Sequence, residues 1–228
     1  MLCIVVYGNH IYVANCGDSK AKLFRRGEFK GDSSKLIPIK ISNLHNAGNF
    51  EEQKKLRAKF KNEKDIIVDK NTASYVKGRL QPTKTIGDLF LKHKKFNEPL
   101  EIQNETTLKY YRKFIPNFSG PYIDHFPEIL TFELTGNDEF IVLGSDGLWD
   151  WLDGFEVAEI LNKFCNDKSK MLHELSTKAL FKASSKVGMN IEELKQIPIS
   201  ARRTVYDDIS IILVDLKNQV AKSTKITS

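Results

Sequence analysis

The chain has 228 residues, of which 41% are hydrophobic and 28% are charged. This composition is typical of one globular domain with a sizeable core and excludes a disordered chain. The longest apolar run, Ile209–Val214, contains Ser210 and is far shorter than the roughly 20 residues that span a bilayer. The sequence therefore predicts a protein with no membrane-spanning helix.

The formal net charge of +6 raises the question of nucleic-acid binding. Such binding needs clustered Lys and Arg side chains that neutralise phosphates. The basic runs at 54–64 and 92–95 are interleaved with acids or aromatics, which favours solvated faces over a nucleic-acid groove. We expect no nucleic-acid partner, and a basic nucleic-acid binder is the weakest of three functional hypotheses.

The cysteines and the first residues bear on the compartment. Cys3, Cys16 and Cys165 are scattered and lack metal-binding spacing, which indicates a reducing environment. The opening residues have no basic leader, long apolar core or Arg-rich transit character. We expect a cytoplasmic or nuclear monomer, with a mitochondrial location left open.

Two hairpins are predicted near the start of the chain. Leu2–Tyr7 and Ile11–Ala14 flank a short turn, and a second hairpin is expected at Ala21–Phe24 with its turn at residues 26–28. The first strand is apolar at every position, so we expect it to be covered on both faces.

An amphipathic helix is predicted to follow. Asn49 with Glu52 three residues later resembles a capping pair, and Leu56 and Phe60 lie four residues apart on one face. Phe90–Pro121 has no clean period and is expected to be a long surface excursion.

Strands and helices are then grouped separately. Strands are expected at Ile129–Leu134 and Glu139–Leu143. Asp153 with Glu156 predicts the start of one helix, and a second helix is expected over 169–186. The apolar face expected for the first helix consists of Phe155, Ala158, Ile160, Leu161 and Phe164.

A buried strand at Ile209–Val214 is expected to close the fold, and residues 218–228 to form a flexible tail. Hairpins kept apart from grouped helices favour an α+β fold over a repeated βαβ unit.

Acidic residues occur at the ends of the predicted strands. They are Asp18, Asp146, Asp150 and the pair Asp207-Asp208. Carboxylates from separate loops suit Mg²⁺ or Mn²⁺, which prefer oxygen ligands. Taken singly, each of these aspartates is more typical of an ordinary turn than of a metal site.

Several segments, in the correct order, resemble the type 2C metal-dependent Ser/Thr protein phosphatase (PPM) family. The resemblance spans nearly the whole chain, and its most distinctive segment is Glu139–Asp150, which ends in Ser-Asp-Gly-Leu-Trp-Asp. The other matching segments are Tyr12–Lys20, Leu80–Asp88, Pro127–Ile129 and Tyr206–Ser210. Leu44–Ala47 and Gly78–Pro82 resemble the branch that contains pyruvate dehydrogenase phosphatases.

This resemblance implies two packed antiparallel β-sheets flanked by helices, and a centre of two or more Mg²⁺ or Mn²⁺ ions that activate water to attack a phosphoprotein substrate. It implies that Asp146 and Asp207 are ligands of the main metal pair, and that Asp150 and Asp18 lie near a further metal position. The residues expected to support these motifs are Gly17, Gly87, Asp88, Gly147 and Asp208. Trp149 is expected to be a packing anchor.

Departures from the family pattern are equally informative. No Asp-Gly-His-Gly occurs in the chain, and the family's Arg-rich opening with its Glu-Asp pair has no counterpart. Lys20 and Lys84 stand where the family commonly has Arg, and Asp208 where it commonly has Asn. We therefore expect residues 1–217 to be a partial phosphatase domain lacking its N-terminal catalytic part, with negligible activity alone. The alternative is a non-catalytic pseudophosphatase binding module.

Overall fold

The computed structural model describes residues 1–29, 31–71, 73–97, 114–202 and 204–217. They form two compact units. One unit contains Leu2–Asn43 and the described residues from Glu128 onward, and the other contains Leu44–Pro127 with Met1. The predicted tail at 218–228 and residues 98–113 of the predicted excursion lie outside the described residues.

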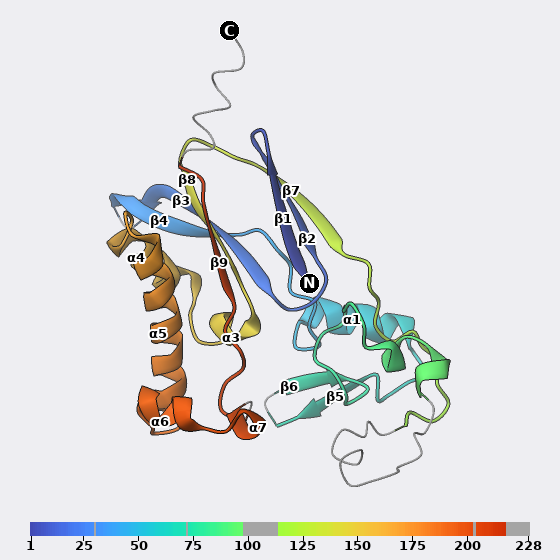
Figure 1. The fold of residues 1–228 in the computed structure, drawn as a ribbon. Helices are drawn as coiled ribbons and strands as arrows, with labels where there is room; N and C mark the ends of the chain where they lie inside the picture. Colours follow the sequence, from blue (N-terminus) through green and yellow to red (C-terminus); the bar gives the residue numbers. More distant parts are fainter. Residues whose placement is uncertain (30, 72, 98–113, 203, 218–228) are drawn as a thin grey trace. The chain divides into compact units, whose positions relative to one another are not determined.

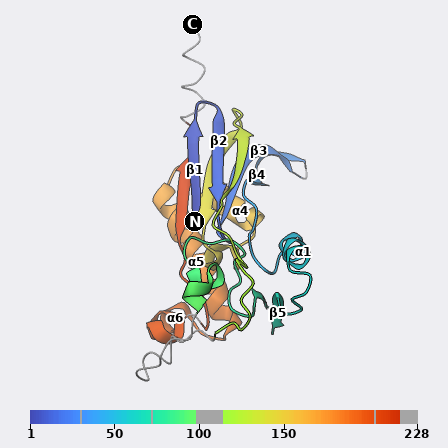
Figure 2. The same cartoon turned by 90° about the vertical axis from the view of Figure 1, so that its right-hand side faces the viewer.

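The first sheet contains β1 (Leu2–Tyr7), β2 (His10–Asn15) and β7 (Glu128–Glu133), paired antiparallel in that order. Figure 2 shows the three strands side by side. The first predicted hairpin is confirmed. The expectation that its first strand is covered on both faces is wrong, because exposed residues alternate with half-buried ones along β1.

The second sheet has the order β4-β3-β8-β9, with β3 at Lys20–Phe29, β4 at Asp32–Lys40, β8 at Asp138–Gly144 and β9 at Ile211–Asp215. The predicted turn at residues 26–28 is wrong, because β3 continues to Phe29. A register shift between Gly27 and Phe29 absorbs the glycine within the strand. The last strand is not fully buried, because Ile212 in β9 is 60% exposed.

An apolar core containing residues of both sheets lies within this unit. It includes Ile11 and Val13 of β2 and Leu23 of β3, all at most 1% exposed, with Ile141 of β8. Leu130 of β7 packs against the same core. The two antiparallel sheets are therefore packed face to face.

Helices pack on the second sheet (Figure 1). They are α3 (Asp146–Trp149), α4 (Gly154–Lys163) and α5 (Lys168–Lys186), followed by the short α6 (Ile191–Gln196) and α7 (Ile199–Arg202). Apolar side chains of α3, α4 and α5 join Phe24 and Phe140 in a second core. The predicted α+β class, with two packed sheets and flanking helices, is confirmed.

The cap predicted for α4 is confirmed in full. The Asp153 carboxylate accepts the Glu156 N–H at 2.9 Å, and the Glu156 carboxylate accepts the Asp153 N–H at 3.1 Å. Phe155 was expected on the buried face, but it is 45% exposed and stacks on Phe29 with ring centroids 4.9 Å apart.

The other unit is built around α1 (Phe50–Lys59) and a hairpin of β5 (Ile67–Lys70) and β6 (Ala73–Val76). Two short 3₁₀ helices, η1 (Leu89–Leu91) and η2 (Lys94–Asn97), follow. Its core includes Leu56, Val76, Leu91 and Tyr122. None of the helices in the described ranges is long and apolar enough to cross a membrane.

Candidate functional site

Adjacent strands bring the predicted acidic residues to one end of the second sheet. Lys20 of β3 pairs with Gly144 of β8, and Gly144 pairs with Ile211 of β9. Asp18 precedes Lys20 by two residues, Asp146 follows Gly144 by two, and Asp207 precedes Ile211 by four. Residues that are far apart in the sequence therefore enter and leave the sheet at the same end.

The surroundings of Asp146 disfavour the ionised form of its carboxyl group. Burial raises the pKa of this carboxyl most strongly, and the negative charges of Asp18, Asp207 and Asp150 raise it further. The Gly147 N–H donates to the Asp146 carboxylate at 2.9 Å, which partly offsets these effects. Asp18, Asp146, Asp150 and Asp207 are thus close enough for their charges to interact, and we call them the acidic cluster.

Asp150 at the end of α3 belongs to the same electrostatic group. Burial is the largest influence and raises its pKa, and the charges of Asp18 and Asp207 act in the same direction. The positive charges of Lys20 and Lys186 oppose them. Acidic neighbours raise the pKa of both Asp146 and Asp150, and a cation would be favoured at such a concentration of negative charge.

Hydrogen bonds of Ser145 join the end of β8 to the segment before β9, and we call them the Ser145 fastening. The Ser145 N–H donates to the Ser210 carbonyl at 3.1 Å, and the Ser210 N–H donates to the Ser145 hydroxyl oxygen at 3.0 Å. The Ser145 hydroxyl in turn donates to the Asp208 carbonyl at 2.9 Å. Asp208 is exposed, so its backbone rather than its carboxylate contributes to this fastening.

Gly147 permits the same two segments to approach closely. A Cβ at this position would lie 2.9 Å from the carbonyl carbon of Asp208 and 3.0 Å from the oxygen of Asp207. Ordinary side chains do not tolerate such contacts with backbone, so glycine is required here. The sequence placed Gly147 in the motif, and the structure supplies the physical reason.

The loop that carries Asp18 is shaped by Asn15. This buried amide donates to the carbonyls of Asn43, Gly17 and Ser19 at 2.6, 3.2 and 3.3 Å. Gly17 has a φ of +132°, which is accessible to glycine and strained for other residues. The Asn15–Ser19 segment therefore holds Asp18 in place through its backbone conformation.

Trp149 is a packing anchor, as predicted. It is 7% exposed, belongs to the core beneath the helices, and donates from Nε1 to the Lys20 carbonyl at 3.0 Å. The Lys22 ammonium lies 5.0 Å from its ring centroid. The tryptophan thus ties α3 to the start of β3, beside the acidic cluster.

The donors of the acidic cluster match hard divalent cations in kind, because all are carboxylates. Among the residues that the structure describes, no group of three or more His, Cys, Asp or Glu side chains is arranged to hold a metal ion. Strand register brings the segments that carry the aspartates to one end of the sheet, and the charges of Asp18 and Asp207 influence Asp146 and Asp150. Their role as metal ligands stays a prediction.

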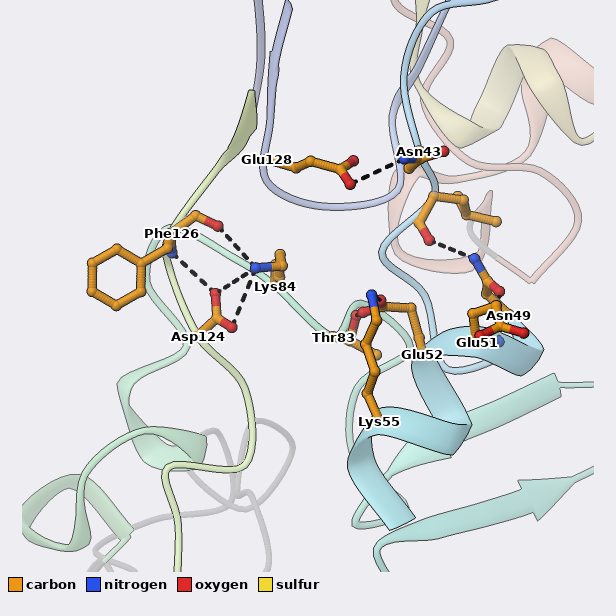
Figure 3. A network of polar contacts seen from close by, with 11 residues as sticks. Asn43, Asn49, Glu51, Glu52, Lys55, Thr83, Lys84, Asp124, Phe126 and Glu128 are labelled. Atoms are coloured by element: carbon orange, nitrogen blue, oxygen red, sulfur yellow. Dashed lines mark hydrogen bonds and ion pairs between the residues drawn. The ribbon is translucent and has the colours of Figure 1, made fainter. Parts of the chain in front are cut away.

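The remaining motif residues, Gly87 and Asp88, belong to the other unit. Asp88 has a left-handed backbone with a φ of +48° and immediately precedes η1. Lys84, in the same motif, donates to both carboxylate oxygens of Asp124 at 3.0 and 3.3 Å and to the Phe126 carbonyl at 3.0 Å (Figure 3). A lysine here therefore retains a charged partner.

Lys186 was not anticipated as a neighbour of the cluster. It is the last residue of α5, and its ammonium lies 5.3 Å from the ring centroid of Trp151. Its charge lowers the pKa of Asp150, yet 36 residues separate the two in sequence (186 − 150). No local motif signals this pairing, because it arises from the packing of α5 near α3.

Comparisons with known proteins agree on the family. The family model described as "Protein phosphatase 2C" matches residues 1–188. The chain is 31% identical to Probable protein phosphatase 2C 28 of Oryza sativa subsp. japonica, over 96% of this chain and 52% of that protein. It is also 31% identical to Probable protein phosphatase 2C 42 of Arabidopsis thaliana, over 98% of this chain and 55% of that protein.

A solved structure shows the same fold. The structure titled "Structure of a C.elegans sex determining protein" matches with a TM-score of 0.55 and 16% identity, covering 98% of this chain and 42% of that one. The chain spans about half the length of the curated relatives above, at 52% and 55%.

Proposed function

The chain belongs to the protein phosphatase 2C family, and from this premise we propose that it forms part of a metal-dependent enzyme that hydrolyses phosphoserine and phosphothreonine in proteins. The single observation that carries the proposal is the acidic cluster at one end of the second sheet. Its members lie in the segments that resemble the family's motifs.

Asp146 and Asp207 would hold Mg²⁺ or Mn²⁺, with Asp150 and Asp18 beside a further cation. Bound divalent cations supply an acidified water and neutralise charge on the phosphoryl oxygens. The chain's own residues fix where this occurs. The Ser145 fastening and the closeness allowed by Gly147 keep Asp146 and Asp207 on neighbouring segments.

The proposal includes that this chain alone does not turn over substrate. Four aspartates offer few protein ligands for two adjacent divalent ions, and the cluster already repels itself. The substrate would be a phosphoprotein, and the likeness to the pyruvate dehydrogenase phosphatase branch does not identify it. A monomer in the cytoplasm or nucleus, without a nucleic-acid partner, stays a prediction.

A chimera tests the function. The part of the rice relative that the chain does not match is fused to this chain, and release of phosphate from a phosphothreonine peptide is measured with Mn²⁺. We expect metal-dependent turnover by the chimera, none by the 228-residue chain, and a loss of at least 100-fold in Asp146→Ala.

Asp167→Asn is the matched control for the chimera. Asp167 caps α5, and asparagine caps helices equally well, so activity should be retained. A folded chimera whose activity is the same with and without Asp146→Ala would overturn the assignment of the cluster. Turnover by the chain alone that disappears in Asp146→Ala would overturn only its proposed incompleteness.

A further inference from the structure

Two lysines from different elements reach the residues on either side of Asp150. The carbonyl of Lys20, the first residue of β3, accepts the Trp149 Nε1–H at 3.0 Å. The ammonium of Lys186, the last residue of α5, lies 5.3 Å from the ring centroid of Trp151. Trp149 and Trp151 are the sequence neighbours of Asp150. Lys20 and Lys186 therefore lie beside the acidic cluster, and we call them the lysine pair.

The charges of the lysine pair act on Asp150 without an ion pair. Burial, the largest influence, raises the pKa of Asp150, and the positive charges of Lys20 and, to a smaller extent, Lys186 lower it. Neither ammonium forms an ion pair with a carboxylate among the residues that the structure describes. Lys186 is exposed and Lys20 is half-buried. The N–H donors of the lysine pair are therefore available to an anion from solution.

An acidic phosphopeptide meets both signs of charge at this end of the second sheet. Its phosphoryl group is attracted to cations held by the acidic cluster, whereas carboxylates beside the phosphorylated residue are repelled by the aspartates. The lysine pair offsets this repulsion. Two unit charges about 7 Å apart in water still change a dissociation constant about threefold. Charges at such a border discriminate between substrates more than they add affinity.

We propose that the lysine pair determines specificity, by selecting phosphoproteins that have acidic residues beside the phosphorylated Ser or Thr. The ammonium groups of Lys20 and Lys186 bind the flanking carboxylates while the phosphoryl group lies at the acidic cluster. This inference rests on the proposed function, because the cluster accepts a phosphoryl group only when divalent cations neutralise it. Peptide binding measures the selection directly and does not require turnover.

Two fluorescein-labelled phosphothreonine peptides test the inference. One has glutamates on both sides of the phosphothreonine, and the other has glutamines in their place. The fluorescence anisotropy of each peptide, titrated with the 228-residue chain in saturating Mn²⁺, gives its dissociation constant. We expect the glutamate peptide to bind at least about threefold more tightly at low salt. The preference should shrink as salt is added, because salt screens exposed charges.

Lys186→Met and Lys170→Met form a matched pair for this titration. Both lysines belong to α5 and lie over an aromatic ring, since the Lys170 ammonium is 4.9 Å from the ring centroid of Phe164. They are 16 residues apart (186 − 170), which is about 24 Å along a helix. Lys186→Met should weaken binding of the glutamate peptide about threefold, and Lys170→Met should leave it unchanged. Lys186→Arg keeps the charge and should retain the preference for glutamate.

The Mn²⁺ affinity of the same variants separates recognition of acidic residues from damage to the cluster. Removing a positive charge does not weaken the attraction of the cluster for a cation. Lys186→Met should therefore bind Mn²⁺ at least as tightly as the wild type while it binds the glutamate peptide less tightly. Lys20→Met should behave in the same way. A purely structural role of either lysine would weaken the binding of Mn²⁺ and of both peptides together.

The possible failures can be told apart. Absence of Mn²⁺ binding to the chain would contradict the proposed function and this inference with it. Mn²⁺ binding without binding of either peptide, or equal affinity for the two peptides, would overturn the inference alone. Equal weakening by Lys186→Met and Lys170→Met would also overturn only the inference, because the lysine beside the cluster would then be no different from the distant one.

Discussion

Gly147 is the residue on which the geometry of the acidic cluster depends most directly. It stands between Asp146 and the backbone of Asp207 and Asp208, where a Cβ would contact main-chain atoms at 2.9 and 3.0 Å. The backbone cannot yield without moving the segment that carries Asp207. The segments that carry Asp146 and Asp207 can therefore lie close together because Gly147 has no side chain.

Gly147→Ala is therefore expected to destabilise the fold by about 1–3 kcal/mol, because the added methyl group overpacks a buried position. Urea denaturation followed by circular dichroism measures the change. Gly136→Ala is the control, since a Cβ there meets nothing within 4 Å, and its effect should stay below about 0.5 kcal/mol. Equal stabilities for the two variants would contradict the close approach at Gly147.

At the scale of single elements, α1 has the predicted N-cap residue, but the acidic residue of the predicted capping pair contacts other groups. Asn49 caps the helix, as predicted, by accepting the Glu51 N–H at 3.0 Å. Glu52 does not complete the predicted capping pair. Its carboxylate accepts a hydrogen bond from the Thr83 hydroxyl and forms an ion pair with the Lys55 ammonium at 2.7 Å (Figure 3). The acid thus fastens α1 to the segment at Thr83.

The pH dependence of stability follows from this contact. Burial raises the pKa of Glu52, but hydrogen bonds from Lys55 and Thr83 outweigh it, so the pKa in the folded state is lowered. The stabilisation is therefore complete above the unfolded pKa of about 4.3 and is lost as pH falls through the folded pKa.

Glu52→Gln should cost about 1–2 kcal/mol near pH 6 and less at about pH 3, because the wild-type protein loses this stabilisation as pH falls below the unfolded pKa. Urea denaturation at both pH values measures the difference. Glu51→Gln, at an exposed position of the same helix, is the control and should cost little at either pH. A Glu52→Gln deficit that grows on acidification would contradict the account.

For the whole molecule, the sequence predicted that strands and helices form separate layers, because strand periodicity and helix caps can be recognised within short segments. The strand expected at 129–134, the helix expected to start at Asp153 and the helix expected over 169–186 are all present, with ends within one or two residues of the expected ones. The elements that were not predicted include the short helices α6 and α7 and the hairpin of β5 and β6, and the turn wrongly expected at Gly27 lies in a strand irregularity. A glycine alone does not distinguish a turn from a bulge.

The sequence predicted that Asp18, Asp146, Asp150 and Asp207 come from separate segments to one place, and their charges do influence Asp146 and Asp150. Their role as a metal site stays a prediction. The Ser145 fastening, the Asn15 amide and the charge of Lys186 depend on contacts between distant segments. Sequence spacing does not encode such contacts. The exposure of one face of β1 could not be predicted either, because a strand that is apolar at every position does not indicate whether this chain itself covers both of its faces.

Binding of Mn²⁺ to the 228-residue chain, measured by isothermal titration calorimetry, tests the central claim that the acidic cluster is a cation site. We expect measurable binding that Asp146→Asn weakens at least tenfold, while Asp167→Asn leaves it unchanged. Asp146→Asn should remain as stable as the wild type without metal, because it removes one of four mutually repelling charges. Mn²⁺ affinity that is the same in wild type and Asp146→Asn would contradict the account.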